Sequence, residues 1–235
     1  MCCLFGTYNY SGQDVKNYSK LTNSLAKQAT IRGTDATGIA YLENYKMVIQ
    51  KEPLSAFEMN LKHPDNVYAV MGHTRHATQG NKKNNYNNHP FIGKCKNASF
   101  ALAHNGILYN DTTLKRKYNL PPTKVQTDSY VAVQLLKYKN VINSKSMKFM
   151  AEQVGGSYSF TVLDSTNKLW LIKGDSPLSV VHFPSEKLYV YASTSEILYK
   201  ALVDTEYFEL VKKGKFKEIT ITEGYILCIK PDGSI

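Results

Sequence analysis

Apolar residues recur along the chain at two spacings, and each spacing predicts a different element. Residues 14–29 place apolar side chains three or four positions apart, which is typical of an amphipathic helix. Shorter apolar runs, such as 224–230 with its alternating pattern, are typical of strands. By this reasoning strands are expected at 2–9, 38–43, 46–51, 67–73, 98–104, 157–164, 168–173, 178–183, 187–192 and 224–230.

The expected helices cluster in the middle of the chain. Thr127 or Asp128 is a candidate cap for one of them, and Ser193 or Thr194 for another. The stretches 75–97 and 212–217 are expected to be loops. Helices are expected at 14–29, 111–119, 127–139, 145–154 and 194–203. Strands at both ends with helices between them predict an α+β fold with largely antiparallel sheets, in one domain over residues 1–235 without a linker.

Composition excludes several classes of protein. The chain has 235 residues, of which 43% are hydrophobic, enough for a sizeable core. No apolar run approaches the roughly 18 residues of a membrane span, and no secretory leader is visible, so a cytoplasmic protein without membrane contact is expected. The net charge is +10, but the lysines are scattered, which favours a solvated surface and makes a nucleic-acid partner unlikely.

The spacing of the four cysteines does not indicate a metal site or a disulfide. Cys2, Cys3, Cys95 and Cys228 form no CxxC pair and no His/Cys cluster with ligand spacing, so we expect free thiols, no metal and no cofactor. Cys95 and Cys228, like Cys3, are interpreted as small core residues.

Cys2 differs from the other cysteines by its position. If Met1 is removed, one residue carries both a thiol nucleophile and an α-amine that titrates near pH ~8, and the amine can take the proton of the thiol through a water. The alternative is a small apolar residue at the start of a buried strand. A retained Met1 would acylate the amine and remove the base.

Three further positions have both a chemical and a structural interpretation. Arg75, in GHTRHATQG (72–80), suits bidentate capture of a carboxylate, or is an exposed loop arginine. The side-chain amide of Asn105 and the N–H of Gly106 can form an oxyanion hole, or a tight Asn-Gly turn. Asp128 can bind an ammonium group, or cap a helix.

Together these positions fit one reaction. Cys2 would attack a carboxamide carbon, Asn105 and Gly106 would hold the developing oxyanion, and Arg75 and Asp128 would clamp a carboxylate and an ammonium group. A molecule with an α-carboxylate, an α-ammonium and a side-chain amide is glutamine.

The order of motifs resembles the glutaminase domain of class II (N-terminal-nucleophile) glutamine amidotransferases, with the nearest likeness to the amino-terminal domain of glucosamine-6-phosphate synthases. The motifs that carry it are Cys2, RGTDATGIA (32–40), GHTRHATQG (72–80), NNHP (87–90), AHNGILYN (103–110) and TDSYV (127–131). The resemblance covers essentially the whole chain. It implies a four-layer αββα sandwich, with two antiparallel sheets between helical layers.

The resemblance also implies roles for individual residues. It assigns Cys2 as nucleophile, through a γ-glutamyl thioester, and Asn105 with Gly106 as the oxyanion hole. It gives Arg75, Thr78 and Asp128 to the glutamine, and His76 is expected beside them.

Some positions depart from the family pattern. Cys3 replaces a Gly, His76 a Trp, Gln79 a frequent His, and Phe91 follows His-Pro where His is frequent. None of them touches the expected chemistry, but they put coupling to a sugar-phosphate partner in doubt.

The sequence shows no acceptor-binding segment after the glutaminase motifs, so we expect the ammonia to pass to a separate synthase subunit. Two alternatives stay open at this point. The substitutions at His76 and Gln79 are also compatible with an N-terminal-nucleophile amidohydrolase for another amide. The missing synthase segment is also compatible with a non-catalytic module that senses glutamine.

Overall fold

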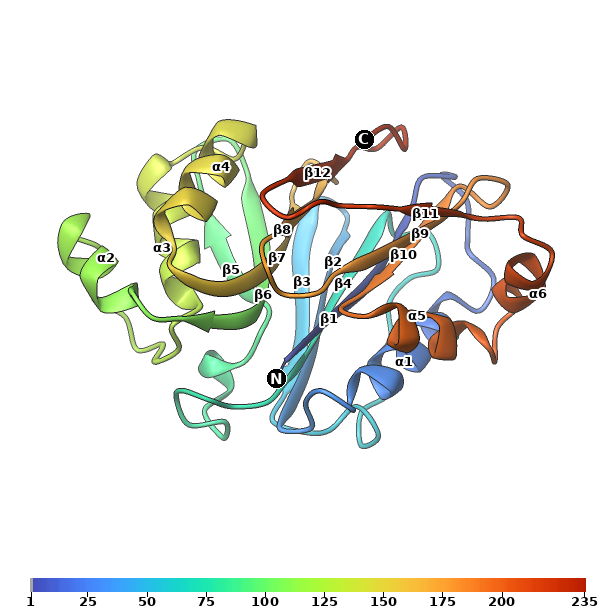
Figure 1. The fold of residues 1–235 in the computed structure, drawn as a ribbon, viewed down its shortest axis with the longest axis horizontal. Helices are drawn as coiled ribbons and strands as arrows, with labels where there is room; N and C mark the ends of the chain where they lie inside the picture. Colours follow the sequence, from blue (N-terminus) through green and yellow to red (C-terminus); the bar gives the residue numbers. More distant parts are fainter. Residues whose placement is uncertain (1) are drawn as a thin grey trace.

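Two antiparallel sheets form the centre of the molecule (Figure 1). The structure is a computed structural model that describes residues 2–235, so Met1 and its removal lie outside the described residues. The seven-stranded sheet has the order β11 (Lys217–Ile219), β9 (Ser179–Phe183), β10 (Leu188–Ala192), β1 (Cys3–Asn9), β4 (Ala69–Arg75), β2 (Ala36–Glu43) and β3 (Lys46–Glu52). The five-stranded sheet has the order β12 (Ile226–Ile229), β8 (Leu169–Lys173), β7 (Gly156–Asp164), β6 (Ser99–Leu108) and β5 (Phe91–Lys94).

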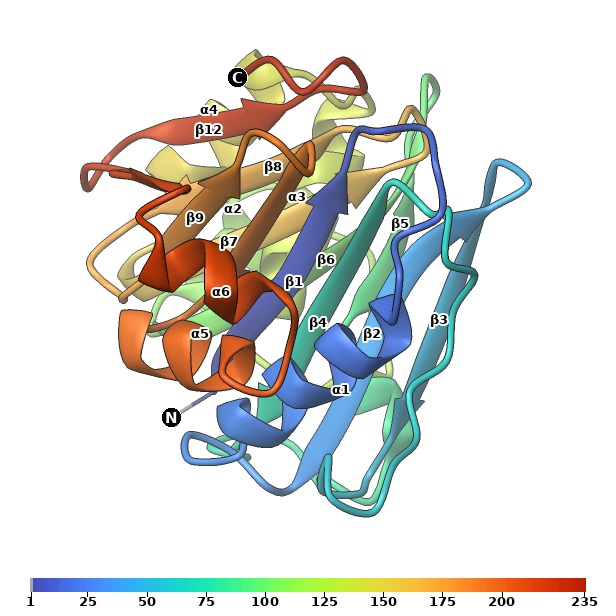
Figure 2. The same cartoon turned by 90° about the vertical axis from the view of Figure 1, so that its right-hand side faces the viewer.

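Helices cover the outer face of each sheet, so the predicted α+β sandwich is confirmed (Figures 1 and 2). The helices on the seven-stranded sheet are α1 (Tyr18–Ala29), α5 (Ser195–Leu202) and α6 (Tyr207–Lys212). Those on the five-stranded sheet are α2 (Asp111–Lys117), α3 (Tyr130–Lys139) and α4 (Ser144–Gln153). Within residues 2–235 no helix has the length and apolar character needed to cross a membrane.

Alternation along the strands sorts side chains between the layers. In β1, Cys3 and Phe5 pack toward α1 and α5, whereas Leu4 packs between the sheets. In β6, Ala101 and Ala103 face the space between the sheets, and their small side chains suit close packing there. The same alternation determines which polar side chains at the strand ends face the space between the sheets.

Several predicted boundaries were wrong where polar residues continue an element. The predicted strand 67–73 ends later, because Thr74 pairs with β1 and β2 and Arg75 pairs with β2. Likewise β6 runs through Asn105 and Gly106, which pair with β7. Backbone pairing with neighbouring strands therefore overrides the polar character of these side chains.

Other corrections concern loops and helix starts. The expected loop 75–97 contains one 3₁₀ turn, η1 (Asn85–Asn87), and strand β5. Helix α1 begins at Tyr18 rather than 14, after Asn17 in a left-handed conformation. Helix α3 begins at Tyr130, and its N-cap Ser129 makes no side-chain cap hydrogen bond, so the cap expected at residues 127 and 128 was wrong. Helix α6 and strand β11 were not predicted.

Buried histidines link the two sheets. The Nε2 of His73 in β4 lies 3.0 Å from the carbonyl oxygen of His104 in β6, so Nε2 carries the hydrogen. The ring of His89 stacks near that of His73, with centroids 4.1 Å apart. Burial lowers the pKa of His73 to about 3 and of His104 to about 4, and it also lowers the pKa of His89. These rings are therefore neutral in the folded protein at neutral pH.

Lowering the pH from about 7 to about 5 should destabilise the fold. In the unfolded protein the histidines titrate near pH ~6.5 and bind protons, whereas in the folded protein these buried rings stay neutral. Stability is full above that pH and falls as the pH drops toward the folded-state pKa values. His73 and His104 should each contribute a loss of about 2 kcal/mol at pH ~5. Urea denaturation at the two pH values measures this loss.

One variant tests this pH dependence. His104→Asn should make the dependence shallower, because it removes one of the buried rings that cause it. A free energy of unfolding that is equal at both pH values would show that the buried histidines are not neutral.

Candidate active site

Cys2 lies at the start of β1, opposite Arg75. The β1–β4 register pairs Cys3 with Thr74, so its continuation pairs Cys2 with Arg75. Alternation places the side chain of Cys2 on the same face as Leu4, toward the five-stranded sheet. The Cys2 Sγ lies 3.6 Å from the carbonyl oxygen of His76, and the Cys2 carbonyl accepts a hydrogen bond from Arg32 Nε at 2.9 Å. The thiol is thus fixed at the end of the inter-sheet layer.

Burial raises the pKa of the Cys2 thiol. A hydrogen bond with the backbone of His76 and the positive charge of Arg75 act in the opposite direction, and the negative charge of Asp128 adds to the rise. The net direction is upward, so the resting sulfur is a thiol rather than a thiolate. Nucleophilic attack by the Cys2 sulfur therefore needs a base that takes the proton of the thiol.

Arg75 is a buried residue of β4, so the alternative of an exposed loop arginine was wrong. One of its terminal nitrogens, NH1, donates to Asn88 Oδ1 at 2.7 Å. The other, NH2, donates to the carbonyl oxygens of Gln79 and Gly80. Burial lowers the pKa of Arg75, whereas the negative charges of Asp35 and Asp128 act to raise it. Arginine stays charged under these conditions, so a positive group lies beside the thiol.

Asn105 faces the same layer from the opposite sheet. It lies two positions after Ala103 in β6, on the same face of the strand as Ala101 and Ala103, and its Nδ2 donates to Ser193 Oγ at 3.3 Å. The same Ser193 Oγ accepts the backbone N–H of Leu4 at 2.9 Å, so one hydroxyl connects Asn105 to β1. Of the two residues expected to cap this helix, Thr194 caps α5 by accepting from Ile197 N, and Ser193 holds Asn105 instead.

Gly106 follows Asn105 within the strand, so the alternative of a tight Asn-Gly turn was wrong. Its φ of +143° lies in the region that favours glycine, and a Cβ there would lie 1.9 Å from the Ser157 carbonyl oxygen. Only glycine fits at this position. The strand backbone therefore adopts a conformation at Gly106 that other residues would not allow.

Asp128 is buried behind β6. Its Oδ2 accepts the N–H of Leu108 at 2.6 Å, and its Oδ1 accepts from Ser129 Oγ at 3.4 Å. Ser129 Oγ in turn lies 2.8 Å from Nδ1 of His104. The carboxylate is near enough to influence the pKa values of both Cys2 and Arg75. A negative group, a positive group and a thiol thus occupy one end of the sandwich.

His76 and Thr78 lie on the exposed rim of this region. His76 contributes its backbone carbonyl to Cys2, while its Nδ1 lies 3.9 Å from Asp35 Oδ2. Asp35 also accepts from Ala77 N at 2.8 Å and from Lys82 Nζ at 2.6 Å. The loop that carries His76 and Thr78 is therefore tied down by one carboxylate rather than by contacts of their own side chains with the thiol.

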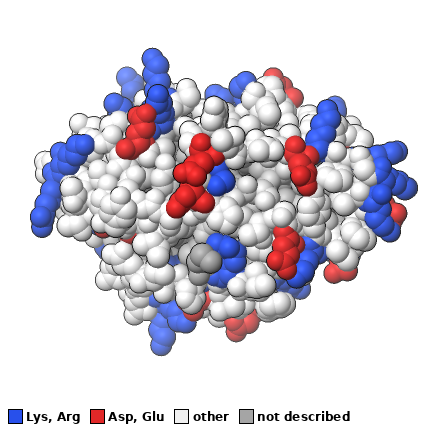
Figure 3. Space-filling model, viewed as in Figure 1, with Lys and Arg blue, Asp and Glu red and all other residues white. Residues whose placement is uncertain are grey.

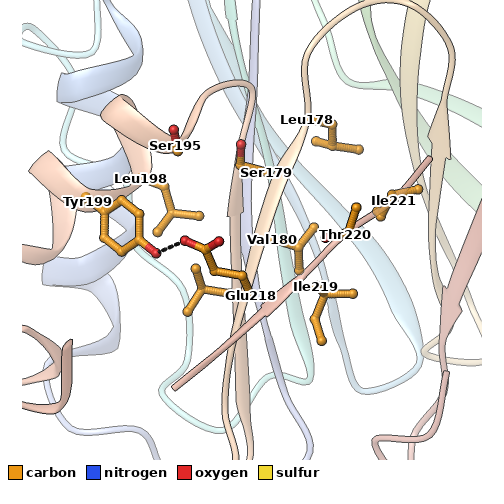
Figure 4. A pocket seen from close by; sticks show the side chains of 11 residues that line it. Leu178, Ser179, Val180, Ser195, Leu198, Tyr199, Glu218, Ile219, Thr220 and Ile221 are labelled. Atoms are coloured by element: carbon orange, nitrogen blue, oxygen red, sulfur yellow. Dashed lines mark hydrogen bonds between the residues drawn. The ribbon is translucent and has the colours of Figure 1, made fainter. Parts of the chain in front are cut away.

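Other surface features lie apart from this site. A hollow of about 210 Å³ lies between β9, β11 and α5, where the hydroxyl of Tyr199 donates to Glu218 (Figure 4). On the face seen in Figure 3, basic and acidic side chains are dispersed around the surface. In residues 2–235, no group of three or more His, Cys, Asp or Glu side chains is arranged to hold a metal ion.

Comparison with known proteins agrees with this arrangement. Residues 73–200 match the family described as "Glutamine amidotransferase domain". The chain is 30% identical over 222 residues to the glutamine–fructose-6-phosphate aminotransferase (isomerizing) of Listeria monocytogenes, which covers 89% of this chain and 35% of that protein. It is also 30% identical over 232 residues to the enzyme of the same name from Staphylococcus aureus, covering 92% and 36%. The chain thus spans about a third of the length of these curated relatives.

Solved structures show the same fold. The glutamine phosphoribosylpyrophosphate amidotransferase of Bacillus subtilis superposes with a TM-score of 0.76 at 22% identity, over 99% of this chain and 48% of that chain. A predicted glutamine amidotransferase from Pseudomonas aeruginosa superposes with a TM-score of 0.53 at 13% identity, over 98% and 97%. The chain belongs to the glutamine amidotransferase family, as a domain of the class II, N-terminal-nucleophile type.

Proposed function

We propose that this protein hydrolyses L-glutamine to glutamate and ammonia through a thioester on Cys2. The observation that carries the proposal is the position of Cys2 opposite Arg75, on the face of the seven-stranded sheet toward which Asn105 points, with the carboxylate of Asp128 near enough to influence both. Family membership supports the same chemistry.

The proposed first step is attack of Cys2 Sγ on the amide carbon of glutamine. Because burial raises the pKa of the thiol, the proton must leave as the S–C bond forms. The α-amine of Cys2, freed by removal of Met1, is the proposed base. The ring of His104 is directed to Ser129, and that of His76 lies near Asp35, which supports the amine over either histidine.

The developing oxyanion needs donors that are already in place. We propose the Nδ2 of Asn105 and the N–H of Gly106, because the first is oriented by Ser193 and the second lies in a strand segment that only glycine can form. Collapse of the intermediate breaks the C–N bond and releases ammonia, which takes the proton carried by the base. Water then hydrolyses the thioester and regenerates the thiol.

The two charged groups of glutamine would be bound on opposite sides of the thiol. Arg75 suits the α-carboxylate and Asp128 suits the α-ammonium, with Thr78 and His76 at the rim of the pocket. This assignment rests on the charges around Cys2 and on the resemblance of the motifs. It explains why a buried arginine and a buried aspartate occur together at this end of the sandwich.

The ammonia is proposed to pass to an acceptor on a separate synthase subunit. The curated relatives are named for glutamine together with fructose 6-phosphate, and this chain spans about a third of their length. The alternative is an acceptor-binding segment in residues beyond this sequence, to which the ammonia would pass in the same way. Copurification of a synthase that raises glutaminase activity supports a subunit, whereas full ammonia transfer by the isolated chain contradicts it.

Cys2→Ala should lower ammonia release from glutamine by a factor of about 10³ or more, because it removes the nucleophile. The melting temperature should change little, since Cys2 is only partly buried. Cys3→Ala is the matched control: Cys3 is fully buried and faces α1, so it should lose about 1 kcal/mol of stability and keep activity. Unchanged hydrolysis by Cys2→Ala would exclude Cys2 as the nucleophile.

Asn105→Ala should lower kcat for glutamine by about 10²- to 10³-fold with a small change in KM, because the oxyanion forms only in the transition state. Steady-state kinetics of the ammonia product measure both constants. An effect confined to KM would contradict the oxyanion role and favour a contact with the ground-state substrate.

A panel of primary amides separates glutaminase from a more general amidohydrolase. We expect kcat/KM for glutamine to exceed that for asparagine and for γ-glutamyl analogues without the α-carboxylate by more than about 10-fold, or ~1.4 kcal/mol. Equal rates across the panel would favour hydrolysis of another amide. Glutamine binding without turnover by protein with a free Cys2 amine would favour a sensor.

A further inference from the structure

Asn88 is a fully buried residue that contacts Arg75 directly. It follows η1, and its Oδ1 accepts from Arg75 NH1 at 2.7 Å. Its Nδ2 donates to the carbonyl oxygen of Lys82 at 3.0 Å and to Asn85 Oδ1 at 3.3 Å. Its backbone carbonyl accepts from Lys51 Nζ at 2.6 Å. Both polar ends of this side chain are therefore engaged, one on the guanidinium and one on the loop.

The acceptors around Arg75 share one property, which is that they are neutral. NH1 meets the amide oxygen of Asn88, and NH2 meets the carbonyl oxygens of Gln79 and Gly80. Neutral acceptors fix the orientation of a guanidinium without cancelling its charge. The positive charge thus stays available for a carboxylate beside Cys2, while the long side chain loses its freedom to swing.

Among these acceptors only Asn88 acts through a side chain. A substitution there changes the support of Arg75 without changing the course of the backbone, whereas the carbonyl oxygens of Gln79 and Gly80 cannot be removed by substitution. The bond of Asn88 to Lys82 also links the guanidinium to the segment that Asp35 anchors through its ion pair with Lys82.

We propose that Asn88 is a positioning residue that sets the affinity for the substrate carboxylate by holding the guanidinium of Arg75 in its binding orientation. This inference rests on the proposed function, because it takes glutamine as the substrate and Arg75 as the group that meets its carboxylate. Asn88 does not touch the reacting atoms. Its effect should therefore appear in KM and in the binding of glutamine, and not in the rate of the chemical step.

The neighbouring Asn87 provides a matched control. It is also fully buried, but its side chain connects Asn81 with the segment before α3: Nδ2 donates to Asn81 O and to Gln126 Oε1, both at 3.0 Å, and Oδ1 accepts from Gln126 N at 2.9 Å. A variant at Asn87 therefore loses a similar number of hydrogen bonds without losing one to Arg75.

Steady-state kinetics with glutamine test the proposal. Asn88→Ala should raise KM about 10-fold and change kcat less than about 3-fold, since it removes a hydrogen bond to a charged group. Asn87→Ala should lower the melting temperature comparably and leave KM within about 2-fold of wild type. Asn88→Asp, which keeps the size of the side chain, should raise KM at least as much, because a carboxylate would neutralise Arg75.

A double-mutant cycle distinguishes positioning from a general loss of loop structure. In an Arg75→Lys background, Asn88→Ala should change kcat/KM less than about 2-fold further, because its effect acts through Arg75. Additive losses in the double variant would overturn the proposal and assign Asn88 a purely structural role. The same KM for Asn88→Ala, Asn87→Ala and wild type would also overturn it.

Calorimetry with glutamine in a Cys2→Ala background gives a readout that does not depend on turnover, and there Asn88→Ala should weaken binding about 10-fold. If wild type hydrolyses glutamine but Asn88→Ala changes neither KM nor binding, the positioning role is wrong and the proposed function stands. If wild type neither hydrolyses nor binds glutamine, the proposed function is wrong and the role of Asn88 is lost with it.

Discussion

The position of the candidate active site depends on the face-to-face packing of two antiparallel sheets, because the side chains of each strand point alternately to the two faces of its sheet. Small residues such as Ala101 and Ala103 fill the layer between the sheets, and the bond between His73 and the His104 carbonyl fixes how β4 and β6 lie against each other. Because alternation is strict, a sulfur at the start of β1 and an amide at the end of β6 face the same space. A shift of one residue in either strand would turn one of them toward a helical layer.

Polar residues at the end of this layer support one another instead of pointing to solvent. Ser193 connects Asn105 to β1, Ser129 connects Asp128 to His104, and Asn88 connects Arg75 to the loop. Each of these neutral side chains holds a charged or reactive group while leaving its charge or donor intact. Hydroxyls and an amide therefore hold these groups, while the ion pair of Asp35 with Lys82 anchors the neighbouring loop.

Sequence reasoning predicted the β2–β3 hairpin and the strands of the last third except β11, because these have a clear period of apolar residues. It did not predict that Arg75, Asn105 and Gly106 lie within strands, since polar side chains mask pairing that only neighbouring strands reveal. The contacts of Ser193 with Asn105 and of Asn88 with Arg75 could not be predicted from the sequence, because each joins residues more than ten positions apart. The assignment of residues 1–235 to one domain, and the roles of the site residues, stay predictions.

The raised pKa of the Cys2 thiol has a consequence outside the catalytic cycle. Peroxides and alkylating electrophiles react with the thiolate form of cysteine, and burial keeps that form scarce at Cys2. The direction of this shift disfavours oxidation of the sulfur, although Cys2 lies near the surface at the very start of the described chain. For the nucleophile proposed above, this would mean a long chemical lifetime between encounters with a substrate.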